Sequence, residues 1–294
     1  MDRTLFGDNQ FFGVNHMSEE KGRAQAMRFQ NIKAVIEVLE SAYAVGIRTF
    51  MCTTHERMAE VCDHFRANRE RYPDYRFYPC LPYAHKYANA AAELGIIEAV
   101  RSFLPSENAA SALLRGGIAL ASKDIEALAE LLIDAELKMF RGLTIPVVFL
   151  QNVATDFLLG LGFDEAFRIF AHCVRTRYGA EPGFITMNAP ALLRKLNALG
   201  LEQPIICTNI NKIGFRMSGE PAAYDDLMRG GRCRLIAMSV FASGSLRPEE
   251  AIEYVCSYTS IESIVFGASS RQNIIQTKQL IDRYTVSNSH ETTR

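Results

Sequence analysis

The sequence predicts a single (β/α)8 barrel, also called a TIM barrel, on three observations. Short apolar runs that suit buried strands alternate with longer segments that carry apolar residues at helical spacing, which is typical of a parallel sheet covered by helices. Eight such strand and helix pairs can be assigned, and 294 residues are an ordinary length for one barrel. Residues 7–13 are GDNQFFG, so the glycine-rich fingerprint of an open doubly wound sheet is absent after the first strand.

The expected strands are short, apolar and bounded by turn-forming residues. They cover 4–7, 47–52, 76–81, 144–150, 183–187, 204–207, 235–240 and 263–266. Helices are expected over 27–45, 57–71, 164–178 and 190–199, and from 248 and from 272 onward. The last two strands each run into a turn of small residues and then a helix. This arrangement places backbone N–H groups at helix amino termini, where anions bind.

Residues 86–141 interrupt the alternation of strands and helices. The run is rich in alanine and leucine and contains no strand pattern, and Pro105 and the glycine pair 116–117 divide it into two or three helices. Because one crossover helix is shorter than this, we expect a helical insertion after the third strand, used for packing, for subunit contact or as a lid. We expect one domain over 1–285, which includes this insertion, and a disordered tail over 286–294.

Composition bounds the classes of function. Hydrophobic residues make up 48% and charged residues 22%, and the net charge of −1 gives no electrostatic case for binding nucleic acid or an anionic membrane. No apolar run reaches the ~18 residues of a membrane span, and the first residues lack the apolar region of a signal peptide. The seven cysteines include no CxxC pair, which is typical of reduced thiols in the cytoplasm. We expect a cytoplasmic protein that binds a small molecule. A homo-oligomer is also compatible with the sequence.

Titratable residues gather in the loops after the first three expected strands. His16, His55 and His85 lie there, and a closed barrel brings such loops to one mouth, where these folds carry their chemistry. With Asp8 or Glu56, the histidines could bind a divalent metal, although no HxH or HExxH spacing is present. Alternatively, one histidine is a general acid or base oriented by a carboxylate, with His55 and Glu56 preferred. Glu56 could also merely cap the helix that follows it.

Neutral polar residues around the same mouth are candidate substrate ligands. They are Tyr83, Gln151, Asn152, Asn188, Asn209 and Asn211. The turns after the last two strands are candidate sites for a phosphate or a cofactor. They contain Ser243, Gly244, Ser245 and Leu246, and Ser269, Ser270, Arg271 and Asn273. Small residues in these turns could instead serve only to make the chain turn tightly.

The segments SVFASGSLRPEEA (239–251) and SIVFGASSRQNI (263–274) resemble the seventh and eighth strand regions of the aldo/keto reductases. The resemblance extends more weakly back to Leu5, and it implies a TIM barrel that holds the phosphates of NADP at these two turns. At the catalytic positions of that family the sequence differs. The family's aspartate, tyrosine, lysine and histidine fall on Met51, on His55 or Glu56, on or near Cys80, and on Gln151 or Asn152.

Three functions follow from these observations. We favour a barrel enzyme with non-redox histidine and carboxylate chemistry, of the lyase, isomerase or dehydratase type, acting on a small polar metabolite that carries phosphate or carboxylate. The second is a divergent NADP-dependent oxidoreductase that reduces a carbonyl. The third is an inactive barrel that acts as a binding or regulatory subunit. The cofactor stays open, with NADP and a divalent metal both compatible with the sequence.

Overall fold

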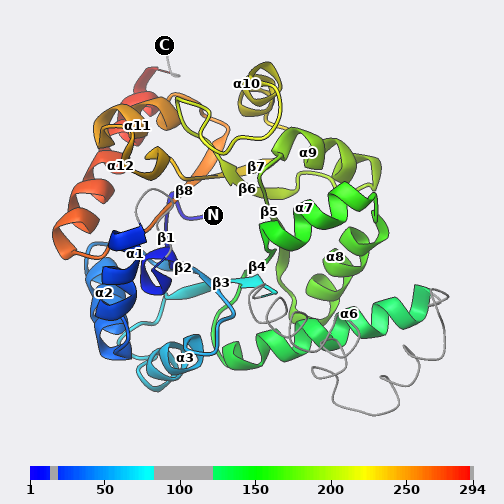
Figure 1. Cartoon of the computed structure of the whole chain (residues 1–294), viewed down its shortest axis with the longest axis horizontal. Helices are drawn as coiled ribbons and strands as arrows, with labels where there is room; N and C mark the ends of the chain where they lie inside the picture. The colour runs from blue at the N-terminus through cyan, green and yellow to red at the C-terminus, as the bar shows by residue number, and fades with distance from the viewer. Residues whose placement is uncertain (14–18, 83–121, 292–294) are drawn as a thin grey trace.

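The computed structural model describes residues 1–13, 19–82 and 122–291 of the chain. Eight parallel strands follow one another in chain order around a closed barrel, and helices surround them (Figure 1). The ring closes where β1 pairs with β8, with Leu5 opposite Val265. The predicted (β/α)8 barrel is therefore confirmed.

All eight expected strands are present, with ends that move by a few residues. They are β1 (Thr4–Gly7), β2 (Thr49–Thr53), β3 (Arg76–Leu81), β4 (Val147–Leu150), β5 (Glu181–Thr186), β6 (Ile205–Asn209), β7 (Arg234–Met238) and β8 (Ile261–Phe266). The largest change is in β4, which begins at Val147 and not at 144. Pro146 precedes it and has no N–H to donate to a neighbouring strand.

The described helices form the outer layer. They are α1 (Glu19–Arg28), α2 (Ile32–Ala44), α3 (Met58–Ala67), α6 (Ser122–Leu137), α7 (Asn152–Leu161), α8 (Glu165–Tyr178), α9 (Ala189–Ala198), α10 (Pro221–Gly230), α11 (Pro248–Cys256) and α12 (Arg271–Glu291). Short 3-10 helices are η1 (Asn9–Phe12), η2 (Lys138–Phe140) and η3 (Ala242–Gly244). None of the described helices is long and apolar enough to cross a membrane.

Several helical predictions need correction. The single helix expected over 27–45 is wrong, because a break separates α1 from α2, and the Asn31 side chain caps α2 by accepting a hydrogen bond from the backbone N of Lys33 (2.9 Å). The helices α7 and α10 were not predicted. Of the insertion expected at 86–141, α6 and η2 are helical, while 83–121 lies outside the described residues. Helix α12 continues to Glu291, into the segment 286–294 that was expected to be a disordered tail.

The barrel interior is a packed apolar core and not a channel. Alternate residues of the strands point inward, as the period of two in a strand requires. The buried members of this inner cluster are Leu5, Met51, Tyr78, Cys80, Val147, Phe149, Ile185, Ile205, Cys207 and Ile236. A second, larger cluster lies between the strands and the helices. A ligand must therefore bind at one end of the barrel.

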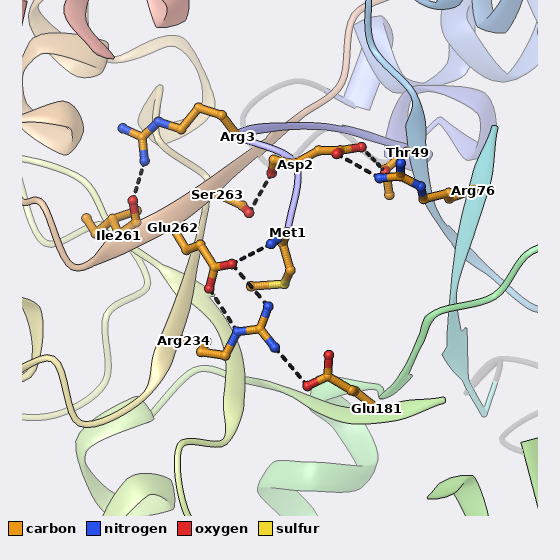
Figure 2. A network of polar contacts seen from close by, with 10 residues as sticks. All are labelled: Met1, Asp2, Arg3, Thr49, Arg76, Glu181, Arg234, Ile261, Glu262 and Ser263. Atoms are coloured by element: carbon orange, nitrogen blue, oxygen red, sulfur yellow. Dashed lines mark hydrogen bonds and ion pairs between the residues drawn. The ribbon is translucent and has the colours of Figure 1, made fainter. Parts of the chain in front are cut away.

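Charged residues join the amino-terminal ends of the strands, as Figure 2 shows. Arg234, at the start of β7, donates to Glu262 (2.9 Å) and to Glu181 (2.7 Å). Arg76, at the start of β3, donates to Asp2 (2.8 Å). These contacts link strands that are far apart in sequence and occupy this end of the barrel with structural ion pairs. The carboxyl-terminal end of the strands is thus the mouth at which chemistry is expected.

Candidate active site at the barrel mouth

Asp8 is a buried carboxyl group at the end of β1. Its Oδ2 accepts hydrogen bonds from the backbone N (2.7 Å) and Oγ1 (2.8 Å) of Thr53, at the end of β2. Burial raises the pKa of Asp8, and the bonds from Thr53 offset only part of this effect. Burial raises the pKa of the nearby thiols of Cys52 and Cys80, and the charge of Asp8 raises it further. A carboxyl in this setting can hold a proton that a surface aspartate would have lost.

Two glutamine side chains at the mouth have an oxygen with no partner among the described residues. Gln10, in η1, is buried and donates through Nε2 to the carbonyl of Gly7 (2.8 Å), while its Oε1 lacks a hydrogen bond within the described chain. This oxygen lies against the backbone of Gly267, where an added Cβ would be 2.0 Å from it. Gln151, which directly follows β4, also has a buried Oε1 without a described partner. Unsatisfied buried acceptors cost roughly 1–3 kcal/mol each, so such atoms point to a ligand or an ordered water.

His55 has a local structural role. Its ring stacks on Phe12 (centroids 4.6 Å apart), and its Nδ1 accepts a hydrogen bond from the backbone N of Arg57 (3.1 Å) at the start of α3. The pKa of His55 is lowered, first by burial and then by the charge of Arg57. The imidazole is therefore neutral at neutral pH. Glu56 is exposed at the same helix start.

Of the predicted three-histidine cluster, the structure describes only His55. His16, His85 and Tyr83 lie outside the described residues, so their place at the mouth stays a prediction. Within the part of the chain that is described, no group of three or more His, Cys, Asp or Glu side chains could hold a metal ion. The metal hypothesis therefore gains no support from these residues.

The asparagines after β5 and β6 bind backbone groups. Asn188 caps α9, with its Oδ1 accepting from the N of Ala191 (3.2 Å). Asn209 donates to the carbonyl of Arg216 (2.8 Å), and Asn211 forms a pair of bonds with the backbone N (2.7 Å) and O (2.9 Å) of Phe215. Asn209 and Asn211 thus hold the loop after β6 in place. Asn152 is the first residue of α7.

The two turns predicted to bind an anion lie on neighbouring strands, since β7 pairs with β8. After β7, Ser243 and Gly244 have positive φ (57° and 93°) within η3, and Ser243, Gly244 and Ser245 are exposed, with Leu246 half-buried. After β8, the Oγ of Ser270 accepts from the backbone N of Asn273 (3.3 Å), inside the first turn of α12. Ser269 is half-buried beside it, and Arg271 and Asn273 are exposed. The geometry places small residues and a helix amino terminus together at the mouth.

Asp156 is a carboxylate that the sequence analysis missed. It lies on α7 and accepts hydrogen bonds from Oγ1 (2.5 Å) of Thr186 and from the backbone N (3.0 Å) of Met187 at the end of β5. Burial raises the pKa of Asp156. Part of the signal for α7 was in the sequence, because the apolar run from 152 is followed by Gly162, and glycine commonly ends a helix; in the structure Gly162 does so in a left-handed conformation.

No protein-family profile matches the sequence, and no curated protein matches it. Several solved structures are similar to this chain. A Pseudomonas aeruginosa protein described as an aldo-keto reductase has a TM-score of 0.61 at 11% identity, covering 96% of this chain and 91% of its own. A structure described as a 2,5-diketo-D-gluconic acid reductase B has a TM-score of 0.54 at 10% identity, covering 97% and 85%. A point mutant of Gox0644, solved in complex with NADPH, has a TM-score of 0.52 at 9% identity, covering 95% and 83%.

Identities this low establish architecture and leave the reaction open. The similarity covers 96% of the chain in one case and 97% in the other, in agreement with the resemblance seen at 239–251 and 263–274. The chain is thus a TIM barrel with the fold of the aldo-keto reductases.

Proposed function

We propose that this chain is an enzyme that transfers a proton at the barrel mouth, with Asp8 as its general acid or base. The substrate is a small polar metabolite that carries a phosphate or carboxylate. The observation that carries the proposal is the environment of Asp8, a buried carboxyl with a raised pKa at the carboxyl-terminal end of a barrel strand. Buried carboxyls with a raised pKa at the carboxyl-terminal end of a barrel strand are candidates for catalytic groups.

The energetics of Asp8 support a catalytic role. Its described hydrogen-bond donors are the neutral N–H and O–H of Thr53, so the cost of burying the ionised form is met by hydrogen bonds and not by an ion pair among the described residues. A purely structural position would favour an asparagine or a threonine, which avoid this cost. A raised pKa, by contrast, makes the protonated carboxyl easier to reach, which suits a group that takes up and releases a proton during turnover.

The other mouth residues supply binding groups for the proposed substrate. The side-chain oxygens of Gln10 and Gln151 can accept hydrogen bonds from hydroxyl or amine groups of a ligand. An anionic group would bind at the β7 and β8 turns, where Ser270 and the amino terminus of α12 offer donors. Gln10 reaches from η1 to Gly267 and thus connects the two parts of the site.

The positions matched to the family's aspartate and lysine support chemistry without hydride transfer. These positions are Met51 and Cys80, and both are buried in the apolar cluster inside the barrel. A tyrosine of ordinary pKa needs a nearby cation to act as an acid, and these two side chains provide none. His55, which matches near the tyrosine, is neutral and bound to the backbone of Arg57.

A second candidate is an NADP-dependent carbonyl reductase in which Asp8 protonates the carbonyl oxygen. The specific support is that NADPH is bound in a structure of the same fold. The turns matched to the NADP phosphates also lie on adjacent strands here. When bound, the nicotinamide would supply the hydride, and Asp8 would hold the proton.

Deuterium exchange tests the proton-transfer proposal and does not require the substrate to be identified first. Phosphorylated and carboxylated metabolites are incubated with the protein in D2O, and incorporation of deuterium at carbon is measured by mass spectrometry. We expect one metabolite to exchange with the wild-type chain and with Asp225→Asn, a control on the exposed surface of α10, but not with Asp8→Asn. Exchange that survives in Asp8→Asn would contradict the assignment of Asp8.

Titration with NADPH separates the two candidates. Quenching of nicotinamide fluorescence at micromolar protein, lost in Ser270→Glu because of added negative charge, would favour the reductase. Deuterium exchange that needs no nucleotide, together with the absence of quenching, would favour the non-redox reaction.

A further inference from the structure

A cavity lies in the outer layer of the barrel, toward the end opposite to the candidate active site. Its volume is about 290 Å³, and it is formed by the end of α3, the loop that joins α3 to β3, and the residues that lead into β4. The backbone N of Phe77 donates to the carbonyl of Thr144 (2.9 Å), so two of these walls are tied together. A volume of this size is at the lower end of the range for ligand pockets, and it suits a molecule with one ring.

Four aromatic residues line the cavity and hold one another in place. They are Phe65, Tyr72, Tyr75 and Phe77, and each is at most 6% exposed. The rings of Phe65 and Tyr75 are stacked, with centroids 4.2 Å apart, and the ring of Phe77 meets these two rings at 81° and 79°. The hydroxyl of Tyr72 donates to the carboxylate of Glu40. Because these rings are fixed by their neighbours, the cavity is preformed and offers aromatic surface to a flat ligand.

Two charged residues that line the cavity, Arg69 and Glu70, have side chains without a partner among the described residues. Both are exposed, and neither forms an ion pair with the other or with another described side chain. The arginines on either side along the chain, Arg66 and Arg71, each pair with a carboxylate. A guanidinium binds carboxylates, and a carboxylate binds ammonium groups. The rim of the cavity thus offers one binding group for each sign of charge.

We propose that this cavity binds a free aromatic amino acid with a single ring. The ring of the ligand packs against the aromatic walls, its carboxylate binds Arg69, and its ammonium group binds Glu70. A purely apolar ligand leaves both charged groups unused, and a small ion without a ring leaves the aromatic walls uncovered. The site is separate from Asp8, so the proposal does not depend on the proposed reaction.

Isothermal titration calorimetry with L-phenylalanine tests the site. We expect a dissociation constant below about 1 mM, which is ordinary for a ligand of this size. Arg69→Ala and Glu70→Ala should each weaken binding about three- to tenfold, because each removes one charged partner at a partly solvated rim. Arg194→Ala is the matched control, since Arg194 is an exposed arginine on α9, and it should bind as the wild type does. No binding well above 1 mM, or binding that neither Arg69→Ala nor Glu70→Ala weakens, overturns the proposal.

Two ligand analogues test the assignment to an amino acid. 3-Phenylpropionate lacks the ammonium group and phenethylamine lacks the carboxylate, so each should bind more weakly than L-phenylalanine. Equal binding of either analogue would contradict the assignment.

A substitution that fills the cavity tests the location of the ligand. The side chain of Thr144 is exposed, so Thr144→Trp should block the cavity without unfolding the chain, which circular dichroism checks. We expect this variant to lose binding of L-phenylalanine and Asp8→Asn to keep it. Binding that survives Thr144→Trp and disappears in Asp8→Asn would place the ligand at the barrel mouth and refute the proposed site.

Discussion

Replacement of Gly183 by alanine tests the packing inside the barrel. Gly183 lies on β5 beside the ring of Phe149 on β4, and an added Cβ would be 2.3 Å from one ring carbon and 2.5 Å from another. Phe149 is fully buried, so its ring cannot move into solvent. Overpacking of this kind costs ~1–3 kcal/mol, which corresponds to a melting temperature lower by about 2–6 °C in a chain of this size.

The matched control for this variant is Gly7→Ala. Gly7 is also a strand glycine, but an added Cβ there would be 3.4 Å from Val265, an ordinary contact. Urea unfolding followed by circular dichroism measures both variants. Adding Phe149→Leu to Gly183→Ala removes the clashing ring carbons, so the double variant should lose at least ~1 kcal/mol less than the two single losses added together. A Gly183→Ala chain as stable as the wild type would refute the packing argument.

The remaining predictions concern ion pairs, protonation and capping. Glu262→Gln should lower the free energy of unfolding by ~1–3 kcal/mol at neutral pH, because Arg234 and the amino group of Met1 hold the carboxylate and lower its pKa below 4.5. The stabilisation by the ionised Glu262 carboxylate is present above the pKa of this group in the unfolded chain and is lost on acidification. The urea unfolding curves of the variant and the wild type should therefore converge near about pH 3, and a difference in stability that stays constant with pH would contradict the pairing. Since the folded pKa of Asp8 is raised above 3.8, its ionisation destabilises the fold as pH rises. Asp8→Asn should thus be at least as stable as the wild type near neutral pH in thermal melts while losing exchange activity, and strong destabilisation would indicate a structural role. Asn31→Ala should cost ~1 kcal/mol by loss of the α2 cap, whereas an unchanged melting curve would show that the cap contributes nothing.

The local sequence pattern was sufficient to predict the order of the strands and helices and the candidate site residues at the ends of the strands. The run 4–7 and the residue after it placed Asp8 at the mouth, and the structure agrees. The roles of these candidates needed coordinates. Asn209 and Asn211 looked like substrate ligands, yet they bond to the backbone of the loop 212–217. Sequence shows that an amide is present, but only the folded chain shows which groups it reaches.

Helix α7 is a second example of what the sequence alone did not predict. Its apolar run was not assigned as a helix, because apolar residues occur on both of its sides and give no alternation of a polar and an apolar face: Leu158 and Leu159 pack against the core, while Phe157 is exposed. Asp156 was missed with it.

The sequence by itself determined the barrel. Alternation of short apolar runs with helical periodicity is a local property that side chains impose on their own segment, and eight repeats of it close into a ring. Tertiary structure alone decided the surroundings of the candidate residues, because the pKa of Asp8 depends on its burial and on hydrogen-bond donors from another strand. Both are set by contacts between residues distant in the chain, and no window of sequence contains them.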